Sequence, residues 1–496
     1  MSKPLIRNAF ANVLQTLAGA VLLFALYRYI SVSLGVEQLG IWSVVLATAS
    51  TVNLADLGLG AGVVRFVARD RARGHSERAA QVVDTAALTL TVSAGGLLVL
   101  LYPLLAEVLA RLFGDHHLEQ ALVILPCALT ALWLAIVGNV FQGALDGCER
   151  MDLRAALVVG GQALLLALAF WLVPQYGLMG LAWAQVIQAL AVAIIGRMML
   201  CRAMPGLSLV PTLWKKSVLR EMLGFGFKIQ VATLFNLLRD PIAKALMARF
   251  GGPAAAGYFE IANQVVIKVR SIIVMANGAI VPHAAALAET ESDRLPALYH
   301  ENIQILIYVT LPPFVLLFAW AGGISWLLTG AFYPEFVLVL GLLCFAWGVN
   351  IFCSPAYFIN LGVGRIGWNM FAHVIMGVLN GCLGWLLGGL YGARGVVFAY
   401  CIAITVASVG LIVAFQRLNR LSLPAGLGGG NLWLLAACLL VVAIGIFAPI
   451  QHDPLVDISD LTVRVFLPLV ALGLAAWFHP MRQRILGLMM TRHARA

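Results

Sequence analysis

Six basic residues lie inside stretches that are otherwise apolar enough to cross a membrane, and these residues are the best placed to do chemistry. They are Arg28, Lys228, Arg239, Lys244, Lys268 and Arg270. Only Asp240 and Glu260 lie beside them as carboxylates, so the local charge is about +4. Arg binds two oxygens of a phosphate at once, and Lys adds a point charge. The pattern therefore predicts a site for a ligand that carries a diphosphate.

Charges of this kind need a wet or paired environment. A charged side chain at the centre of a bilayer costs roughly 2.5–3.5 kcal/mol, so it is expected to face other charges or a water-filled cavity. The stretch 254–282 shows two polar stripes at helical spacing. The first holds Glu260, Gln264 and Lys268, four residues apart, and the second holds Asn263, Arg270 and Asn277, seven residues apart. A helix that is polar over one broad sector and apolar elsewhere fits a cavity wall.

The preceding stretch, 225–250, has a similar character. Asp240 and Lys244 are four residues apart and can form an ion pair. Pro241 lacks an N–H group, which leaves a carbonyl free one turn earlier and predicts a kink.

Two interpretations of these charges remain open. Asp240 could pair with Lys244, and Glu260 with Lys268, only to hold helices together. That scheme leaves Arg28, Arg239 and Arg270 without obvious partners. For these three, and for Lys268, substrate binding is the favoured hypothesis, whereas the remaining polar residues of the two stretches are expected to line the cavity or form structural pairs.

The elements that must position these residues are membrane helices. The 496 residues are 62% hydrophobic and 11% charged, whereas soluble domains are about 25% charged. A spanning helix needs about 20 mostly apolar residues, and fourteen stretches qualify. They are 9–33, 38–63, 82–106, 120–142, 155–174, 178–200, 225–250, 254–282, 303–329, 335–360, 367–387, 395–416, 432–450 and 463–479.

The basic residues of the loops indicate the orientation. With the N-terminus in the cytoplasm, 22 of the 32 Lys and Arg residues lie in cytoplasmic segments and four lie outside. Cytoplasmic loops are enriched in Lys and Arg, so both termini are expected in the cytoplasm. The net charge of +10 is thus explained by topology, and no nucleic-acid partner is expected.

The sequence also repeats itself. YGLMGLAWAQVI begins at Tyr176, and YGARGVVFAYCI begins at Tyr391 in the second half of the chain. Gly147 and Gly362 are matched at the same offset, while Gly35 aligns with Gly251 and Gly40 with Gly257. Such periodicity indicates two homologous halves. Because each half has six spans, the halves share one orientation, and repeats of this kind commonly enclose a central cavity.

These features predict an all-α polytopic membrane protein with about fourteen transmembrane helices. Two parallel six-helix halves surround a central cavity, and two C-terminal helices stand outside the repeat. The expected domains are an N-terminal lobe (1–205), a cytoplasmic linker (206–224), a C-terminal lobe (225–420) and the last two spans with a basic tail (421–496).

The stretch ISVSLGVEQLGIW, followed by NLADLGLGAGVVRFVAR, resembles the start of polysaccharide-export (O-antigen) flippases. Their superfamily also contains lipid-II flippases and multidrug and toxin extrusion transporters. The resemblance covers the first twelve spans. It implies a transporter of the bacterial cytoplasmic membrane that moves undecaprenyl-diphosphate-linked oligosaccharide to the outer leaflet by alternating access. Membrane lipids, and glycan polymerase and chain-length proteins of the same pathway, are the implied partners.

Three alternatives stay open at this point. A lipid-II flippase has a substrate with the same diphosphate. A multidrug extrusion transporter binds cations and should have an acidic cavity, which the basic residues disfavour. A membrane glycan polymerase or ligase would need catalytic groups outside, where the longest connectors have about a dozen residues and Asp115, His116 and His117 form the one tempting cluster. No nucleotide-binding loop, metal-ligand spacing or cofactor motif is recognisable in the sequence, and no enzymatic activity is expected.

Overall fold

Helices account for nearly all of the described chain, as lipid requires, because a membrane offers the backbone no water with which to form hydrogen bonds. The computed structural model describes residues 3–51, 58–278, 280–421, 429–447 and 462–482. No strand occurs among these residues. The chain divides into two units, Met1–Gly257 and Tyr258–Ala496.

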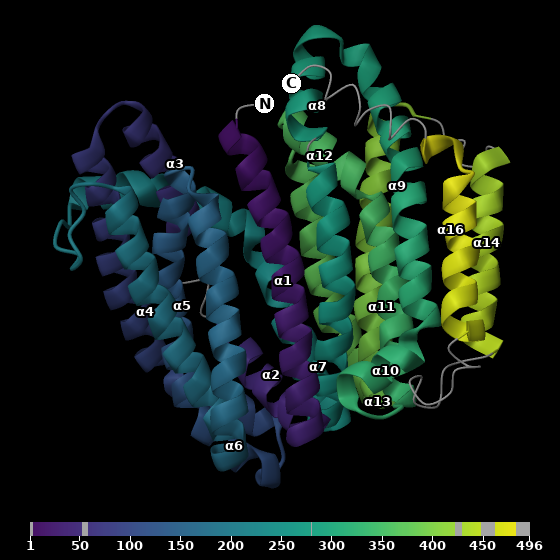
Figure 1. Ribbon diagram of the computed structural model, residues 1–496, viewed down its shortest axis with the longest axis horizontal. Helices are drawn as coiled ribbons and strands as arrows, with labels where there is room; N and C mark the ends of the chain where they lie inside the picture. Colours follow the sequence, from purple (N-terminus) through teal and green to yellow (C-terminus); the bar gives the residue numbers. More distant parts are fainter. Residues whose placement is uncertain (1–2, 52–57, 279, 422–428, 448–461, 483–496) are drawn as a thin grey trace. The chain divides into compact units, whose positions relative to one another are not determined.

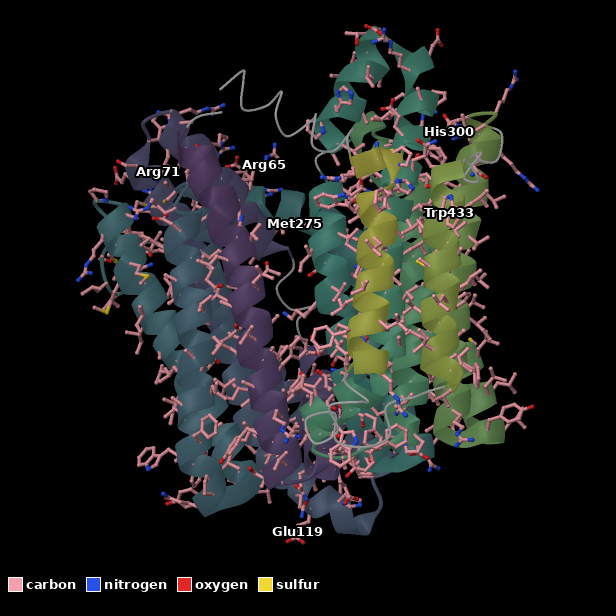
Figure 2. The ribbon with its side chains drawn as sticks, turned by 45° about the vertical axis from the view of Figure 1, so that its right-hand side comes forward. Arg65, Arg71, Glu119, Met275, His300 and Trp433 are labelled. Atoms are coloured by element: carbon pink, nitrogen blue, oxygen red, sulfur yellow. The ribbon has the colours of Figure 1, made fainter. Side chains whose placement is uncertain are left out.

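The first unit is a bundle in which α5 packs between α4 and α6, and α1 packs on α6 (Figure 1). Its helices are α1 (Lys3–Ser33), α2 (Val36–Ser50), α3 (Leu59–Ala72), α4 (Ser76–Leu112), α5 (Asp115–Gly147), α6 (Met151–Ala203) and the first part of α7 (Lys216–Asn277). Arg65 and Arg71 lie at one end of this bundle and Glu119 at the other (Figure 2). This separation fits an alternation of cytoplasmic and outer loops.

The second unit contains the rest of α7 and a bundle in which α11 packs on α9 and α13. Its helices are α8 (Ile280–Thr290), η2 (Ser292–Arg294), α9 (Leu295–Ala319), α10 (Ala321–Thr329), α11 (Pro334–Phe352), α12 (Ser354–Val363), α13 (Gly367–Leu418), α14 (Gly429–Phe447), η3 (Thr462–Phe466) and α16 (Leu467–Trp477). Helices α14 and α16 lie side by side against α9, at one edge of this unit (Figure 1).

The predicted spans coincide with these helices. Where the fourteen stretches fall on described residues, they are almost entirely helical, with single-residue turns such as those at Trp320 and Cys353. Within the described residues, eight helices are long and apolar enough to cross a membrane. Helices α6, α7 and α13, with 53, 62 and 52 residues, are too long for one crossing. They leave helical dihedrals at Gly177, Gly252 and Gly392, between the paired spans that the sequence predicts. The predicted all-α polytopic fold is confirmed.

Backbone geometry supports the internal repeat. Gly177 has φ 56° and ψ −135°, and Gly392, its match in the second half, has φ 62° and ψ −146°. Positive φ is costly for residues with a Cβ, so glycine stands at both turns. The alignment of Gly35 needs a correction, because its positive φ of 91° recurs at Gly252, with φ 76°, and not at Gly251.

Two other matched glycines make reciprocal contacts inside the first unit. A Cβ on Gly40 would lie 1.8 Å from the carbonyl oxygen of Pro253, and a Cβ on Gly257 would lie 2.4 Å from that of Val36. The spacing from Gly40 to Gly257 equals the spacing from Val36 to Pro253. Helix α2 and the segment that follows Gly252 therefore meet backbone to backbone, through equivalent positions of the two repeats.

The boundary between the two units does not coincide with the boundary between the predicted domains. The division after Gly257 falls inside α7, whereas the sequence places a linker at 206–224. The first part of this linker, from Gly206 to Lys215, is irregular and belongs to the first unit. The lobes 1–205 and 225–420 remain a prediction drawn from the repeat.

Candidate functional site

The polar stripes of α7 lie on a continuous helix after Gly252, as predicted. Their members differ in burial. Glu260, Asn263 and Asn277 are buried within the second unit. Gln264, Lys268 and Arg270 are half-buried, so they keep the accessible surface that ligand binding requires.

Arg270 has well-defined partners, which the sequence did not reveal. Its Nε donates to Oδ1 of Asn350 on α11 at 3.0 Å, and its guanidinium lies 4.6 Å from the ring centroid of Trp347. Asn350 in turn donates to Oγ of Ser408 on α13 at 2.8 Å. The expectation that Arg270 lacks a partner was wrong, because its partners come from another helix, far along the chain.

The arrangement orients the guanidinium. The amide of Asn350 holds one edge of the guanidinium, and the indole of Trp347 covers one face. Both groups are uncharged, so neither neutralises the positive charge of Arg270. A guanidinium has five N–H donors, of which Nε uses one on Asn350. Three helices thus fix a cation that can bind an anion in a defined direction.

Asparagines of the second unit join helices to one another. Asn277 donates to Oγ of Ser354 on α12 at 2.7 Å, and Asn360 donates to Oδ1 of Asn369 on α13 at 3.1 Å. All four side chains are buried. Asn277 therefore takes part in a hydrogen bond between helices.

The pairing of Glu260 with Lys268, one of the two open interpretations, does not occur. Gln264 donates to Oε1 of Glu260 at 3.1 Å, and the Lys268 ammonium makes no ion pair with a described residue. Residues eight apart on a helix are separated by about 12 Å along its axis, beyond the reach of a direct pair. Lys268 is therefore a half-buried cation that can take part in ligand binding.

Arg239 also has a partner, which corrects a second expectation. Its Nε donates to Oδ1 of Asp240 at 2.9 Å, with the two side chains 12% and 31% exposed. The dihedrals of α7 stay helical at Pro241 and depart at Gly252 instead. Asp240 thus pairs with Arg239. An additional ion pair between Asp240 and Lys244 stays a prediction.

The predicted ion pair between Asp240 and Lys244 can be tested by exchanging the two residues. We expect Asp240→Ala and Lys244→Ala each to lower the yield of folded protein, because each leaves an opposite charge at membrane depth. The double exchange Asp240→Lys with Lys244→Asp should restore part of that yield. Size-exclusion profiles of detergent-solubilised protein measure it, and an exchange no better than either alanine variant would refute the pair.

Two further predicted residues complete the basic set. Arg28 lies on α1 in the first unit and is exposed. The side chain of Lys228 lies outside the described residues. Within the described residues, no group of three or more His, Cys, Asp or Glu side chains is arranged to hold a metal ion.

The acidic and histidine cluster at the start of α5 is only partly described. The side chains of Asp115 and His116 lie outside the described residues. His117 contacts Oε1 of Glu37 on α2 through its Nε2 at 3.2 Å. This contact joins two helices of the first unit.

One buried ion pair was missed by sequence reasoning. Asp84 on α4 is fully buried and accepts a hydrogen bond from Nη2 of Arg197 on α6 at 2.8 Å. Asp84 also accepts from the backbone N–H groups of Thr212 and Leu213, at 3.0 and 3.1 Å. Arg197 donates to the carbonyl of Ser208. The pair therefore clamps the linker onto the bundle, and Arg197, counted among the 22 basic residues of the cytoplasmic segments, has a structural partner as well.

A second charged cluster joins α3, α4 and α7 at the same end of the first unit. Glu221 accepts from Arg69 at 2.7 Å and from Arg78 at 2.8 Å, and Arg69 also pairs with Asp70 at 2.9 Å. Hydrogen bonds from Arg69, with those from Arg78, hold the pKa of Glu221 below its ordinary value of 4.5, although burial opposes the shift.

This depressed pKa predicts a loss of stability in acid. The stabilisation from Glu221 is fully present above its ordinary pKa of 4.5 and is lost as the pH falls through its lower folded-state pKa. We expect Glu221→Gln to reduce the acid dependence of the apparent melting temperature of the purified protein between about pH 7 and pH 3. Glu107→Gln, at an exposed pair with Arg111, is the matched control. An unchanged pH profile in Glu221→Gln would contradict the assignment.

The fold and its intramembrane cations define a polytopic helical membrane protein. A solved multidrug resistance transporter of the MATE family and MOP superfamily, inward-facing, matches with a TM-score of 0.69, 17% identity and 82% and 96% coverage of this chain and that chain. The lipid II flippase MurJ, in an inward closed conformation, matches with a TM-score of 0.73, 11% identity and 95% and 98% coverage. A MOP superfamily transporter from Pyrococcus furiosus, described as having a binding pocket of reversed polarity, matches with a TM-score of 0.55, 16% identity and 84% and 94% coverage. These likenesses establish the fold.

The sequence itself identifies the family. Residues 5–287 match the model of the polysaccharide biosynthesis protein family. The matched region is more than half of the 496 residues. The chain belongs to the polysaccharide biosynthesis protein family. No curated protein matches it.

Proposed function

We propose that this protein is a flippase for lipid-linked oligosaccharide. It moves an undecaprenyl-diphosphate-linked oligosaccharide from the inner to the outer leaflet of the bacterial cytoplasmic membrane, for surface or exopolysaccharide biosynthesis. Membership of the polysaccharide biosynthesis protein family over residues 5–287 is the observation that carries this proposal. The fold shared with a lipid II flippase over 95% of the chain adds support.

The cations at membrane depth fit the diphosphate of such a substrate. Arg270 presents a guanidinium held by Asn350 and Trp347, and Lys268 lies two residues earlier on the same helix. Charge-assisted hydrogen bonds to phosphate are about twice as strong as neutral ones. We assign substrate binding to Arg270 and Lys268, with Arg239 and Arg28 as further basic contacts.

The two repeats suggest the transport mechanism. Parallel repeats commonly rock against each other so that a site opens to one side of the membrane at a time. We propose alternating access of this kind, with both termini in the cytoplasm. Glycan polymerase and chain-length proteins are the proposed functional partners on the outer side.

A deletion strain provides the decisive test. Mass spectrometry of its lipid extract should show accumulation of a lipid-linked oligosaccharide, and re-expression of the wild-type gene should remove it. An unchanged lipid-linked oligosaccharide pool would refute the proposal.

Lipid II transport is the second candidate, favoured by the TM-score of 0.73 with a lipid II flippase. The same lipid extract separates the two functions. Accumulation of a peptidoglycan precursor, with loss of viability, would identify lipid II as the substrate and would replace the proposed oligosaccharide.

A further inference from the structure

A polar pocket of about 670 Å³ opens at one end of the first unit, where α4 and α7 begin. Its lining includes none of the intramembrane cations of α7. His75, Ser76 and Arg78 form its wall from the α4 side, and Lys215 and Ser217 form it from the α7 side. Gln81 on α4 also lines the pocket, as do Glu77 and Glu221.

Two helix N-termini meet at this pocket. Helix α4 begins at Ser76, and its N-cap residue, His75, makes no side-chain capping hydrogen bond. Helix α7 begins at Lys216, next to Lys215 in the wall. The first turn of a helix has N–H groups without intrahelical partners and a partial positive charge. Anions bind readily at such ends.

The wall of the pocket also carries carboxylates, so its net charge depends on the cations that pair with them. Glu221 accepts hydrogen bonds from both Arg69 and Arg78. The same two cations also pair with Asp70, at 2.9 and 3.6 Å, so the two positive and two negative charges offset one another. Glu77 and Lys215 then contribute opposite charges to the wall. The two helix N-termini and the adjacent Lys216 leave the pocket with a positive balance.

Gln81 independently indicates a ligand. Its side chain is only 8% exposed and lines the pocket. Among the described residues it has no hydrogen-bond partner. Its amide atoms are not among the buried side-chain atoms that lack a partner, so they keep accessible surface toward the pocket. The amide N–H donors of Gln81 are therefore available for an oxyanion in the pocket.

Neighbouring apolar side chains place the pocket at the level of lipid headgroups. Gln81 directly precedes the apolar stretch 82–106. In the adjoining linker, Leu209, Val210 and Trp214 are 64%, 68% and 49% exposed. The Trp214 indole donates to Oγ1 of Thr89 at 3.1 Å. Trp is enriched at the boundary between lipid and water, so this linker is suited to lie in that boundary.

We propose that this pocket binds a phosphate group at the cytoplasmic surface of the membrane, carried by an anionic phospholipid or free in solution. The helix N-termini, Lys215 and Gln81 supply the donors. The pocket is distinct from the proposed transport site, and occupation by an anionic lipid would fix the linker against the bilayer surface.

The test compares two phosphate sources on the purified full-length protein. In one arm, native mass spectrometry counts phosphatidylglycerol retained from vesicles of phosphatidylcholine and phosphatidylglycerol. In the other, inorganic phosphate is titrated against protein in phosphate-free detergent buffer by calorimetry. Lys215→Ala and Gln81→Leu should each weaken binding about tenfold, the loss expected for one hydrogen bond to a charged group.

Arg202→Ala is the matched control, because Arg202 is an exposed cation outside the pocket lining at the same end of the unit. It should bind like wild type. Ser217→Asp, an exposed change that adds repulsion, provides a second probe if Gln81→Leu does not fold. If the pocket variants lose binding only to the phosphatidylglycerol vesicles, the ligand is a lipid headgroup. If they lose binding to inorganic phosphate, the ligand is a free anion. Binding in neither arm, or binding equal in wild type and all pocket variants, would overturn the proposal.

Discussion

Asp84→Ala should lower the stability of the protein by about 3–5 kcal/mol, the usual cost of breaking a buried ion pair. Asp84 is fully buried and accepts from Arg197 and from two backbone N–H groups of the linker. Its removal leaves the Arg197 charge without its carboxylate and both amides without their acceptor. We expect a large drop in apparent melting temperature and in the yield of folded protein from membranes.

Two comparisons separate this effect from a general response to charge removal. Glu107→Ala breaks an exposed pair with Arg111, whose side chains are 58% and 78% exposed, and should cost at most about 0.5 kcal/mol. Asp84→Leu combined with Arg197→Met removes both charges and should recover part of the loss. Recovery should stay incomplete, because the backbone of the linker still loses its partners. A single Asp84→Ala variant as stable as Glu107→Ala would show that the clamp contributes little.

Arg270→Ala should abolish glycan export while the protein still inserts into the membrane. The substitution removes a guanidinium that Asn350 and Trp347 orient at membrane depth. Arg270→Lys should be only partly active, because an ammonium keeps the charge but loses the planar geometry. Export is measured by complementation of a deletion strain, with protein level determined by immunoblot.

A structural role for Arg270 predicts a different pattern. If Arg270 serves only to join helices, Asn350→Ala should impair export as strongly, because it breaks the same hydrogen bond. If Arg270 binds substrate, Asn350→Ala should keep substantial export, because the charge remains. Arg249→Ala, which removes an exposed cation from the same helix, should export normally. Full export by Arg270→Ala at normal protein level would exclude it from the transport site.

The fold was largely predictable because its signals are local. Apolar stretches of sufficient length mark membrane helices, and glycines such as Gly177 and Gly392 mark the turns between them. Even the alignment error at Gly251 was a single residue, since neighbouring glycines look alike until their φ angles are known.

The site was less predictable because its contacts connect distant parts of the chain. Spacing along one helix located Arg270 and Lys268, but it could not show that Asn350 holds Arg270. Asp84 carried a usable signal, as an acidic residue inside the apolar stretch 82–106. Its partner Arg197 lies far along the chain, on α6, so its role could not be read from spacing.

The reciprocal contacts of Gly40 with Pro253 and of Gly257 with Val36 also bear on the ancestry of the chain. A half-length polypeptide would carry only one such glycine and one such carbonyl. It could form both contacts only by meeting a second copy of itself. Fusion of two such copies would make both contacts intramolecular and free each copy to diverge, provided that the glycines were kept. The present chain therefore retains, in one polypeptide, an interface of the kind that a homodimer divides between two genetically identical subunits.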